Sequence, residues 1–336
     1  MSPYAAAHKN PQGPGDARPT ALQIVKDNDL TGKLEGKVAL ITGTSSGLGI
    51  ETARALKATG MRVFGAVRNI AKATEALKDD LEPGHLELIH LDMNSLASVR
   101  ACAQELLSKT DKLHIFIANA GIMMTPEGKT ADGFELQLGT NHLAHFLLFQ
   151  LLKPTLLASA TPTSGARVVA LSSVGHRGAE INFDDMDFSS RGYDPVAAYA
   201  QSKLAAVYMA NAIERHYSTQ NLHAWSIMPG GIWTGLQDTL PQAVVDMWKG
   251  DAEFQKGWKS AEQGAATSVW AAVAKELEGK GGRYLEDCQV ASQAPEPTGS
   301  PADMGFPGYA AYAYDEEKEE RLWKISCEMV EVAEEA

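Results

Sequence analysis

The chain has 336 residues, of which 44% are hydrophobic and 21% charged, a composition typical of one large soluble α/β domain. Its net charge of −12 argues against a nucleic acid or an anionic membrane surface as the main partner. The three cysteines, Cys102, Cys288 and Cys327, are odd in number and far apart, and they show no metal-ligand spacing. We therefore expect reduced thiols and no metal site.

The beginning of the chain predicts a flexible tail over residues 1–19, because prolines and glycines are frequent there. No continuous apolar run in this region has the length of a signal peptide or a membrane span. Residues 20–336 are expected to form a single domain. The sequence therefore predicts a cytoplasmic protein without a membrane anchor.

Short apolar segments alternate along the chain with segments of helical periodicity. This alternation is typical of a doubly wound α/β fold, in which helices cover both faces of a parallel sheet. The expected strands are 37–42, 61–67, 86–91, 113–118, 166–172, 222–228 and 282–285. The expected helices are 47–59, 70–80, 95–109, 133–158, 196–218, 260–276 and an acidic terminal helix at 315–333.

The first expected strand leads directly into the glycine-rich turn Thr42-Gly43-Thr44-Ser45-Ser46-Gly47-Leu48-Gly49. Gly43 allows a tight turn, Gly47 lets the backbone approach a pyrophosphate, and Gly49 lets the next helix pack close to the strand. The N–H groups and the dipole of that helix favour phosphate. An ordinary strand–helix turn is the alternative, but the position of the motif between a strand and a helix favours a nucleotide site.

Tyr199-Ala-Gln-Ser-Lys203 places a tyrosine and a lysine on one face of an expected helix. A fixed ammonium beside a phenol favours the phenolate and lowers the pKa of the tyrosine. Such a pair can move a proton near neutral pH, which a free tyrosine does poorly. The alternative is a half-buried tyrosine beside a solvated lysine.

Several further stretches follow in a recognisable order: Leu91-Asp92-Met93, Asn119-Ala120-Gly121-Ile122-Met123, Thr140-Asn141-His142-Leu143-Ala144-His145-Phe146, Val168-Val169-Ala170-Leu171-Ser172-Ser173, Pro229-Gly230-Gly231, Gly282-Arg283-Tyr284-Leu285-Glu286-Asp287-Cys288 and Leu322-Trp323. Together with the glycine turn and the Tyr199/Lys203 pair, they resemble the short-chain dehydrogenase/reductase family. The chain looks closest to the branch of retinol-dehydrogenase-like and WW-domain-oxidoreductase-like enzymes. The similarity extends from about residue 20 to residue 329.

The resemblance implies a single domain with a Rossmann-like sheet of seven strands and a substrate lobe formed by residues 231–260 and 291–310. It implies that Tyr199 exchanges the proton, Ser173 donates a hydrogen bond to the reacting oxygen, and Lys203 assists the tyrosine. Asn141 would hold a water that links Lys203 to solvent. Ser172 is expected to be structural.

Each of these residues also has a structural alternative, since a serine can simply end a strand and an asparagine can simply satisfy helix backbone groups. Two histidines, His145 and His176, could serve as general bases. We do not favour them, because no nucleophile–base triad accompanies them.

The resemblance also assigns residues to a dinucleotide cofactor. The glycine turn would bind the phosphates, Asp92 and Met93 would lie by the adenine, and Lys203 would hold the nicotinamide ribose together with Tyr199. The remaining assigned residues are Asn119, Ala120 and Gly121 along the cleft, and Pro229, Gly230, Ile232 and Thr234 near the nicotinamide.

The end of the second expected strand favours NADP(H) over NAD. An acid that would hold the ribose 2′-hydroxyl is expected there, but the chain has Val67, followed by Arg68. A guanidinium can bind the extra 2′-phosphate of NADP, and Ser45 could add a hydrogen bond. Alternatively, Arg68 pairs with a surface carboxylate.

The sequence constrains the substrate only weakly. The segment after Pro229 is rich in tryptophan and methionine, which favours a lipophilic or aromatic small molecule, although these residues could equally be core. We expect NADPH-dependent reduction of a ketone or aldehyde, and a step in secondary metabolism stays open. The alternatives are NADP-dependent oxidation of a retinol-like or steroid alcohol, and a non-catalytic NADP-binding sensor. The resemblance further allows a homodimer through the helices at 133–158 and 196–218.

Overall fold

The computed structural model describes residues 2–296 and 305–334. Its sheet has eight strands in the order β3-β2-β1-β4-β5-β6-β7-β8. They are β1 (Val38–Thr42), β2 (Arg62–Val67), β3 (Leu86–His90), β4 (Ile115–Ala118), β5 (Ala166–Leu171), β6 (Leu222–Met228), β7 (Arg283–Glu286) and β8 (Gln289–Val290). The first seven are parallel, in agreement with the predicted strands.

The predicted number of seven strands is wrong by one, because β8 pairs antiparallel with β7. The hairpin between them turns at Asp287 and Cys288, both of which have φ of 54°. Non-glycine residues rarely adopt this left-handed conformation. A strand of two residues after a turn without glycine gives almost no sequence signal.

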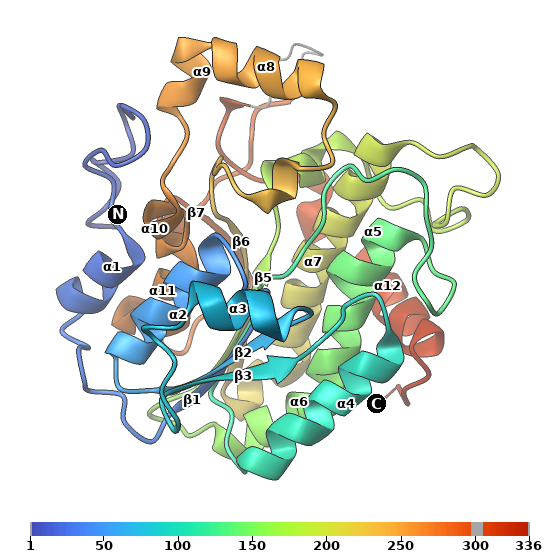
Figure 1. Ribbon diagram of the computed structural model, residues 1–336. Helices are drawn as coiled ribbons and strands as arrows, with labels where there is room; N and C mark the ends of the chain where they lie inside the picture. Colours follow the sequence, from blue (N-terminus) through green and yellow to red (C-terminus); the bar gives the residue numbers. More distant parts are fainter. Residues whose placement is uncertain (1, 297–304, 335–336) are drawn as a thin grey trace.

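Helices cover both faces of the sheet (Figure 1). One face packs against α1 (Ala21–Asp27), α2 (Leu48–Ala58) and α11 (Ala266–Val273), and the other against α4 (Leu96–Lys109), α6 (Ala144–Ser159) and α7 (Pro195–Tyr217). The alternation of side chains along β1 illustrates this division. Ala39 and Ile41 belong to the core on the α2 side, whereas Val38 and Leu40 belong to the core on the α6 side.

The other helices are shorter or lie at the edges of the sheet. The α-helices are α3 (Ile70–Ala76), α5 (Leu136–Leu138), α8 (Gln242–Gly250), α9 (Ala252–Lys256), α10 (Ala261–Gly264) and α12 (Glu316–Met329). A π-helical turn, Gly139–Leu143, joins α5 to α6. The 3-10 turns are Val174–Gly178, Ser218–Gln220, Gly235–Gln237, Lys275–Leu277 and Ala311–Tyr314.

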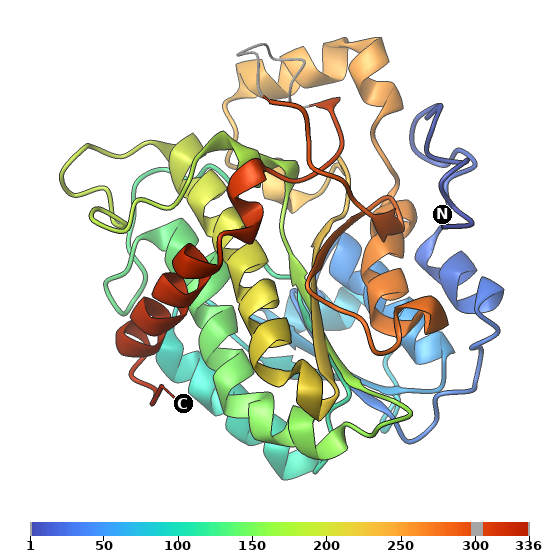
Figure 2. The ribbon, with the colours of Figure 1, turned by 180° about the vertical axis from the view of Figure 1, so that it is seen from behind.

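The predicted acidic terminal helix is present as α12, and it lies across α6 and α7 (Figure 2). Its Trp323 ring is 4.9 Å from the Phe146 ring and 6.1 Å from the Phe149 ring, centroid to centroid. On the same side, Glu319 and Glu320 pair with Arg215 of α7. The apolar face of α12 therefore lies in the core, and two of its acidic side chains form ion pairs with α7.

The N-terminal residues differ from the predicted flexible tail, because they pack against the domain beside α9 and α10 (Figure 1). Arg18 is 4% exposed and Tyr4 is 9% exposed. The prolines and glycines there produce irregular turns with buried side chains and long-range hydrogen bonds, which composition alone does not reveal.

Helices α8 and α9 lie beyond the carboxyl ends of the strands, within the expected lobe 231–260 (Figure 1). In the second expected part, 291–310, residues 297–304 lie outside the described residues. The rest of that part pairs with itself beside β7, since the Ala294 N–H donates to the Tyr309 carbonyl over 2.8 Å.

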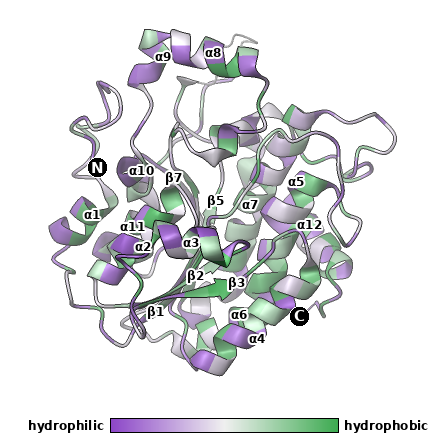
Figure 3. Ribbon diagram, in the orientation of Figure 1, coloured by the Kyte–Doolittle hydropathy of each residue, from purple (hydrophilic) through white to green (hydrophobic). Residues whose placement is uncertain are grey.

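Hydropathy follows these layers, with apolar residues gathered along the strands and the inward faces of the helices (Figure 3). In the part of the chain that the structure describes, no helix has both the length and the apolar character needed to cross a bilayer.

Candidate active site

The glycine turn lies at the carboxyl end of β1, where strand order reverses and β4 becomes the neighbour. Parallel sheets bind ligands in the crevice at such a point. Gly43 has φ of 78°, and a Cβ there would come within 2.9 Å of the Ala120 backbone. A Cβ at Gly49 would overlap the Gly43 carbonyl, and one at Gly47 would be 2.8 Å from Thr234. These three positions therefore require glycine, and the turn fits a dinucleotide phosphate.

The turn is tied to the end of β4 by Thr42. Its Oγ1 accepts hydrogen bonds from the Asn119 and Ala120 N–H groups, over 3.0 and 2.9 Å. The Asn119 amide donates to the Thr42 carbonyl over 2.7 Å. The predicted cleft residues Asn119 and Ala120 thus hold the two strand ends together, and Gly121 continues toward Asn141 and Lys203.

His145 extends this network to Asn141. Since Thr42 Oγ1 accepts two N–H groups, its own proton goes to His145 Nε2, 2.8 Å away. Nδ1 therefore carries the ring proton and donates to the Asn141 carbonyl over 3.0 Å. Burial lowers the pKa of His145 to about 4, so the ring is neutral at pH 7. The sequence offered a signal for this contact, because the two residues are four positions apart.

Asn141 lies in the π-helical turn and is 4% exposed. Its side-chain amide donates to the Ile122 carbonyl and to Ser202 Oγ, each over 2.9 Å. Its oxygen accepts from the Ile122 N–H over 2.9 Å. The Asn141 side chain thus links the segment after β4 to Ser202 of α7, and the backbone carbonyl of Asn141 accepts from His145.

Tyr199 and Lys203 share one face of α7, as their spacing predicts, and both are buried. The lysine Nζ is 5.7 Å from the centre of the tyrosine ring and donates to the Leu171 carbonyl over 3.1 Å. Burial raises the pKa of Tyr199 to about 12, and a hydrogen bond with Ser173 opposes this rise. Burial lowers the pKa of Lys203 to about 8.

The predicted lowering of the tyrosine pKa is therefore wrong. Desolvation of the phenolate is the largest effect on Tyr199, and the lysine ammonium is directed toward a backbone carbonyl. The phenol is in its neutral form, which is the form that can donate a proton.

Ser173 follows β5 and faces Tyr199 across the first turn of Val174–Gly178. Its Oγ accepts from the Gly175 N–H over 3.0 Å. Gly175 is needed there, because a Cβ would lie 2.8 Å from the Tyr199 ring. The preceding Ser172 is buried and donates to the Lys203 carbonyl over 2.8 Å, which ties β5 to α7.

His176 is held between two backbone groups. Its Nδ1 is 2.6 Å from the Ser173 carbonyl and its Nε2 accepts from the Ala310 N–H over 3.1 Å. Burial lowers the pKa of His176 to about 4. Neither His176 nor His145 has a free nitrogen for base catalysis.

On the far side of the crevice, Arg68 follows β2 and is exposed. Within residues 2–296 and 305–334 it has no hydrogen bond or ion pair, so the alternative of a carboxylate partner has no support. Asp92 caps its own turn by accepting from the Asn94 N–H over 3.0 Å, and Met93 is buried in the core. Ser45 is half-buried and Ser46 exposed.

The segment after β6 closes the crevice. Lys259 Nζ donates to the Pro229 carbonyl over 3.1 Å, and a Cβ on Gly230 would overlap that lysine. Ile232 forms a parallel bridge with Lys259, and Thr234 caps the next turn. The predicted residues 229–234 thus lie over the glycine turn, in contact with it through Thr234 and Gly47.

An apolar cluster surrounds Tyr199. It consists of buried side chains and partly buried ones from the segment after β4 and the lobe, namely Met123, Met124, Leu236, Leu240, Val244, Val245 and Trp248. Most of these residues come from the tryptophan- and methionine-rich segment whose role the sequence left open. Several of them pack around the tyrosine, so that segment borders the candidate site as well as contributing to the core.

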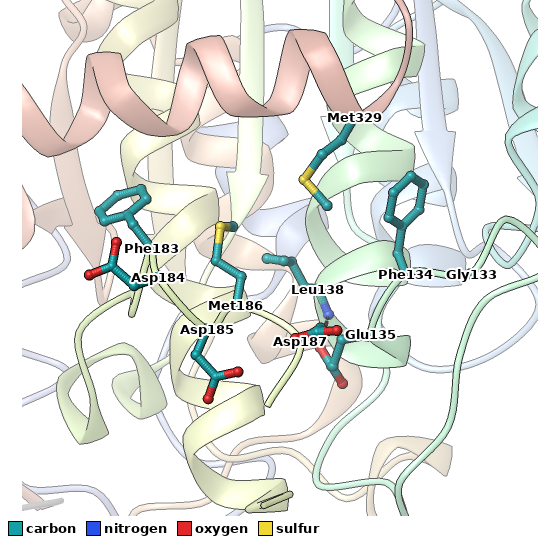
Figure 4. Close-up of a pocket in the computed structure, with 10 residues that line it drawn as sticks. All are labelled: Gly133, Phe134, Glu135, Leu138, Phe183, Asp184, Asp185, Met186, Asp187 and Met329. Atoms are coloured by element: carbon teal, nitrogen blue, oxygen red, sulfur yellow. Dashed lines mark hydrogen bonds between the residues drawn. The ribbon is translucent and has the colours of Figure 1, made fainter. Parts of the chain in front are cut away.

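A hollow lies away from these residues, between α5, the segment 183–187 and the end of α12 (Figure 4). Its carboxylates are engaged locally: Glu135 caps α5, and Asp185 accepts from the Ser190 N–H. The described residues contain no group of acids, histidines and cysteines that could hold a metal ion. The hollow includes none of the four predicted catalytic residues.

Comparison with known proteins agrees with this site. A family model described as short chain dehydrogenase matches residues 37–244. The chain is 48% identical to short-chain dehydrogenase/reductase prx1 of Penicillium roqueforti, over 98% of this chain and 96% of that protein. It is 36% identical to human retinol dehydrogenase 12, over 89% and 87% of the two chains.

Among solved structures, the Pseudomonas aeruginosa RhlG/NADP active-site complex superimposes with a TM-score of 0.61 and 25% identity, covering 76% of this chain and 96% of that one. The similarity to retinol dehydrogenase 12 agrees with the predicted branch. With the glycine turn, the Tyr199/Lys203 pair and these relatives together, the chain belongs to the short-chain dehydrogenase family and is an oxidoreductase.

Proposed function

We propose that the protein reduces a ketone or aldehyde on a lipophilic small molecule with NADPH, and that Tyr199 is the proton donor. The observation that carries this proposal is the position of the neutral Tyr199 phenol. It is hydrogen-bonded with Ser173, lies near Lys203 and stands against an apolar cluster.

When bound, the nicotinamide would supply the hydride that reaches the carbonyl carbon. The negative charge that develops on the carbonyl oxygen needs a hydrogen-bond donor and then a proton. Ser173 Oγ would donate the hydrogen bond and the Tyr199 hydroxyl the proton. Lys203 would stabilise the resulting phenolate through its ammonium. A water held by Asn141 would link Lys203 to solvent and so return a proton.

The preference for NADPH rests on Arg68. It is exposed at the carboxyl end of β2, has no partner within the described residues, and follows Val67 where an acid would select NAD. A guanidinium there can bind a 2′-phosphate. The RhlG/NADP active-site complex gives a precedent for NADP on this fold.

A lipophilic substrate is supported by the cluster beside Tyr199, which contains no charged residue. Oxidation of a retinol-like, polyprenol-like or steroid alcohol would use the same groups in reverse. Names of relatives such as retinol dehydrogenase 12 and polyprenol dehydrogenase favour this second candidate. A tailoring step in secondary metabolism is a narrower version of the first.

A homodimer stays a prediction from the resemblance. Helix α12 lies over α6 and α7, so a dimer through those helices would have to include α12 in the interface or displace it. A non-catalytic NADP sensor is the least favoured function, because Asn141, Ser173, Tyr199 and Lys203 are all present and lie close to one another.

The test is consumption of NADPH and NADH with a panel of lipophilic ketones, quinones and aldehydes. Tyr199→Phe should reduce turnover at least ~100-fold, because the proton donor is lost. Tyr208→Phe is a matched control, since that tyrosine lies on the same helix but its hydroxyl donates to the Tyr312 carbonyl. Equal turnover in Tyr199→Phe and the native chain would refute the proposed role.

The cofactor is tested in the same assay with Arg68→Ala. We expect the KM for NADPH to rise about tenfold and the KM for NADH to stay unchanged, since only NADPH has a 2′-phosphate. An equal loss for both nucleotides would contradict the assignment.

A further inference from the structure

Residues 2–18, which we call the N-terminal strap, are hydrogen-bonded to the residues that border the site. The Gly13 N–H donates to the Lys256 carbonyl over 3.0 Å. The Gly15 N–H donates to the Gln263 side-chain oxygen over 2.9 Å, and the Gln263 amide donates to the Asp16 and Arg18 carbonyls, each over 3.1 Å. The strap is therefore bonded to the backbone and side chains that surround Trp258 and Lys259.

Arg18 is the centre of this contact. It is 4% exposed, and its guanidinium donates to the Gly257 carbonyl over 2.8 Å and to the Trp258 carbonyl over 2.5 Å. Its Nε donates to Asp16 over 2.8 Å. Burial opposes ionisation of Asp16, but hydrogen bonds from Arg18 and from backbone lower the pKa of Asp16 to about 2. The pair is thus charged, and the planar guanidinium fixes two successive carbonyls.

Those carbonyls belong to residues that hold the turn after β6. The Trp258 ring stacks on Trp233, with the ring centres 4.1 Å apart and the planes at 15°. The Lys259 N–H donates to the Gly231 carbonyl over 2.8 Å. A Cβ on Gly231 would be 3.3 Å from the Trp258 ring, so the two segments are in close contact.

A second route leads from the strap to the same turn. His8 Nδ1 is 3.0 Å from Asp287 Oδ1, and that oxygen is 2.7 Å from Lys259 Nζ. Lys259 Nζ also donates to the Pro229 carbonyl over 3.1 Å, and its side chain is 3% exposed. Both routes therefore end on residues 229–233.

We propose that Arg18 is a positioning residue for the nicotinamide side of the site, acting through Trp258 and Lys259 on the turn 229–234. This inference rests on the proposed function and on the expectation, from the family resemblance, that this turn lies near the nicotinamide. It implies that the strap affects binding of the nicotinamide half of the cofactor and leaves the 2′-phosphate half, at Arg68, unchanged.

The test compares two nucleotides bound to Arg18→Ala in the full chain. NADPH reaches both halves of the site, whereas adenosine 2′,5′-bisphosphate reaches only the Arg68 half. We expect NADPH to bind about tenfold more weakly, because the turn near the nicotinamide would no longer be held in place, and we expect the bisphosphate to bind as to the native chain. Arg321→Ala is the control, because that arginine makes an exposed pair with Asp184 away from the strap.

A spectroscopic readout needs no nucleotide. Stacking of Trp233 on Trp258 should give a coupled near-ultraviolet circular dichroism signal, which Arg18→Ala should reduce. Asp16→Asn is the milder variant in case Arg18→Ala does not fold, and it should change both readouts in the same direction but less.

Three outcomes are decisive. Native circular dichroism and native NADPH affinity in folded Arg18→Ala would overturn the inference and leave the proposed function intact. Equal weakening of both nucleotides would also overturn it, because the effect would be a general loss of structure. No binding of NADPH to the native chain would overturn the proposed function, and the inference with it.

Discussion

Helix α7 carries Tyr199, and helix α8 packs against the apolar cluster around that tyrosine, yet the two helices are built in opposite ways. Helix α7 is 23 residues long and buried continuously from Ala198 to Ile213. Helix α8 has nine residues, none of them buried, and its Met247 is 63% exposed. The groups that would move protons are therefore held in the close-packed helix α7. Helix α8, which would meet the substrate, is not buried, so a change in its position costs little free energy.

The sharpest test of this contrast is the same substitution in both helices. Met209→Ala in α7 should lower the free energy of unfolding by about 2–5 kcal/mol, because it leaves a cavity in the core. Met247→Ala in α8 should change it by no more than about 0.5 kcal/mol. Chemical denaturation of the two variants measures both values, and similar losses would contradict the comparison.

A methyl group added beside Tyr199 should reduce turnover as well. Gly175→Ala places a Cβ 2.8 Å from the Tyr199 ring, so the phenol must move. We expect turnover to fall about 100-fold, as for a displacement of about 1 Å in a catalytic group. Gly178→Ala is the control, because its Cβ would lie at an ordinary 3.4 Å from Ala200. Native turnover in Gly175→Ala would show that the residues around Tyr199 can make room for the methyl group without moving the phenol.

Burial of Lys203 and Tyr199 should also determine how the rate of reduction depends on pH. Burial lowers the pKa of Lys203 to about 8, so its ammonium is present below pH 8 and is lost as the pH rises through that value. Tyr199 stays neutral over this range, because burial raises its pKa to about 12. We expect kcat to be constant from pH 6 to 7.5 and to fall about tenfold per pH unit well above 8.

Stopped-flow measurement of the reduction rate from pH 6 to 9.5 checks this expectation, with circular dichroism to confirm that the fold persists. A rate that stays constant to pH 9.5 would mean that the lysine charge is not needed for the rate-limiting step.

Sequence reasoning succeeded where function depends on local spacing. The strand before Gly43, the helix that carries Tyr199 and Lys203, and the order of the motifs all follow from neighbouring residues. The sequence analysis missed β8, α1 and α8, because these elements are short and give little periodic signal.

The direction of the Tyr199 pKa shift could also not be predicted from residue spacing alone. A lysine four residues from a tyrosine predicts a lowered phenol pKa, but the direction depends on how deeply both groups are buried and where Nζ points. In the same way, Arg18 lies in a stretch whose composition predicts a flexible tail, and its partners at 257 and 258 are distant in sequence.

The position of α12 has a consequence for how the protein is made. Val38 at the start of β1 and Val330 after α12 belong to one apolar core cluster, together with Trp323. While the chain emerges from the ribosome, Phe146 and Phe149 must therefore remain without Trp323 as a partner until α12 has been synthesised. Such an exposed apolar surface favours chaperone binding until the docking of α12 covers it.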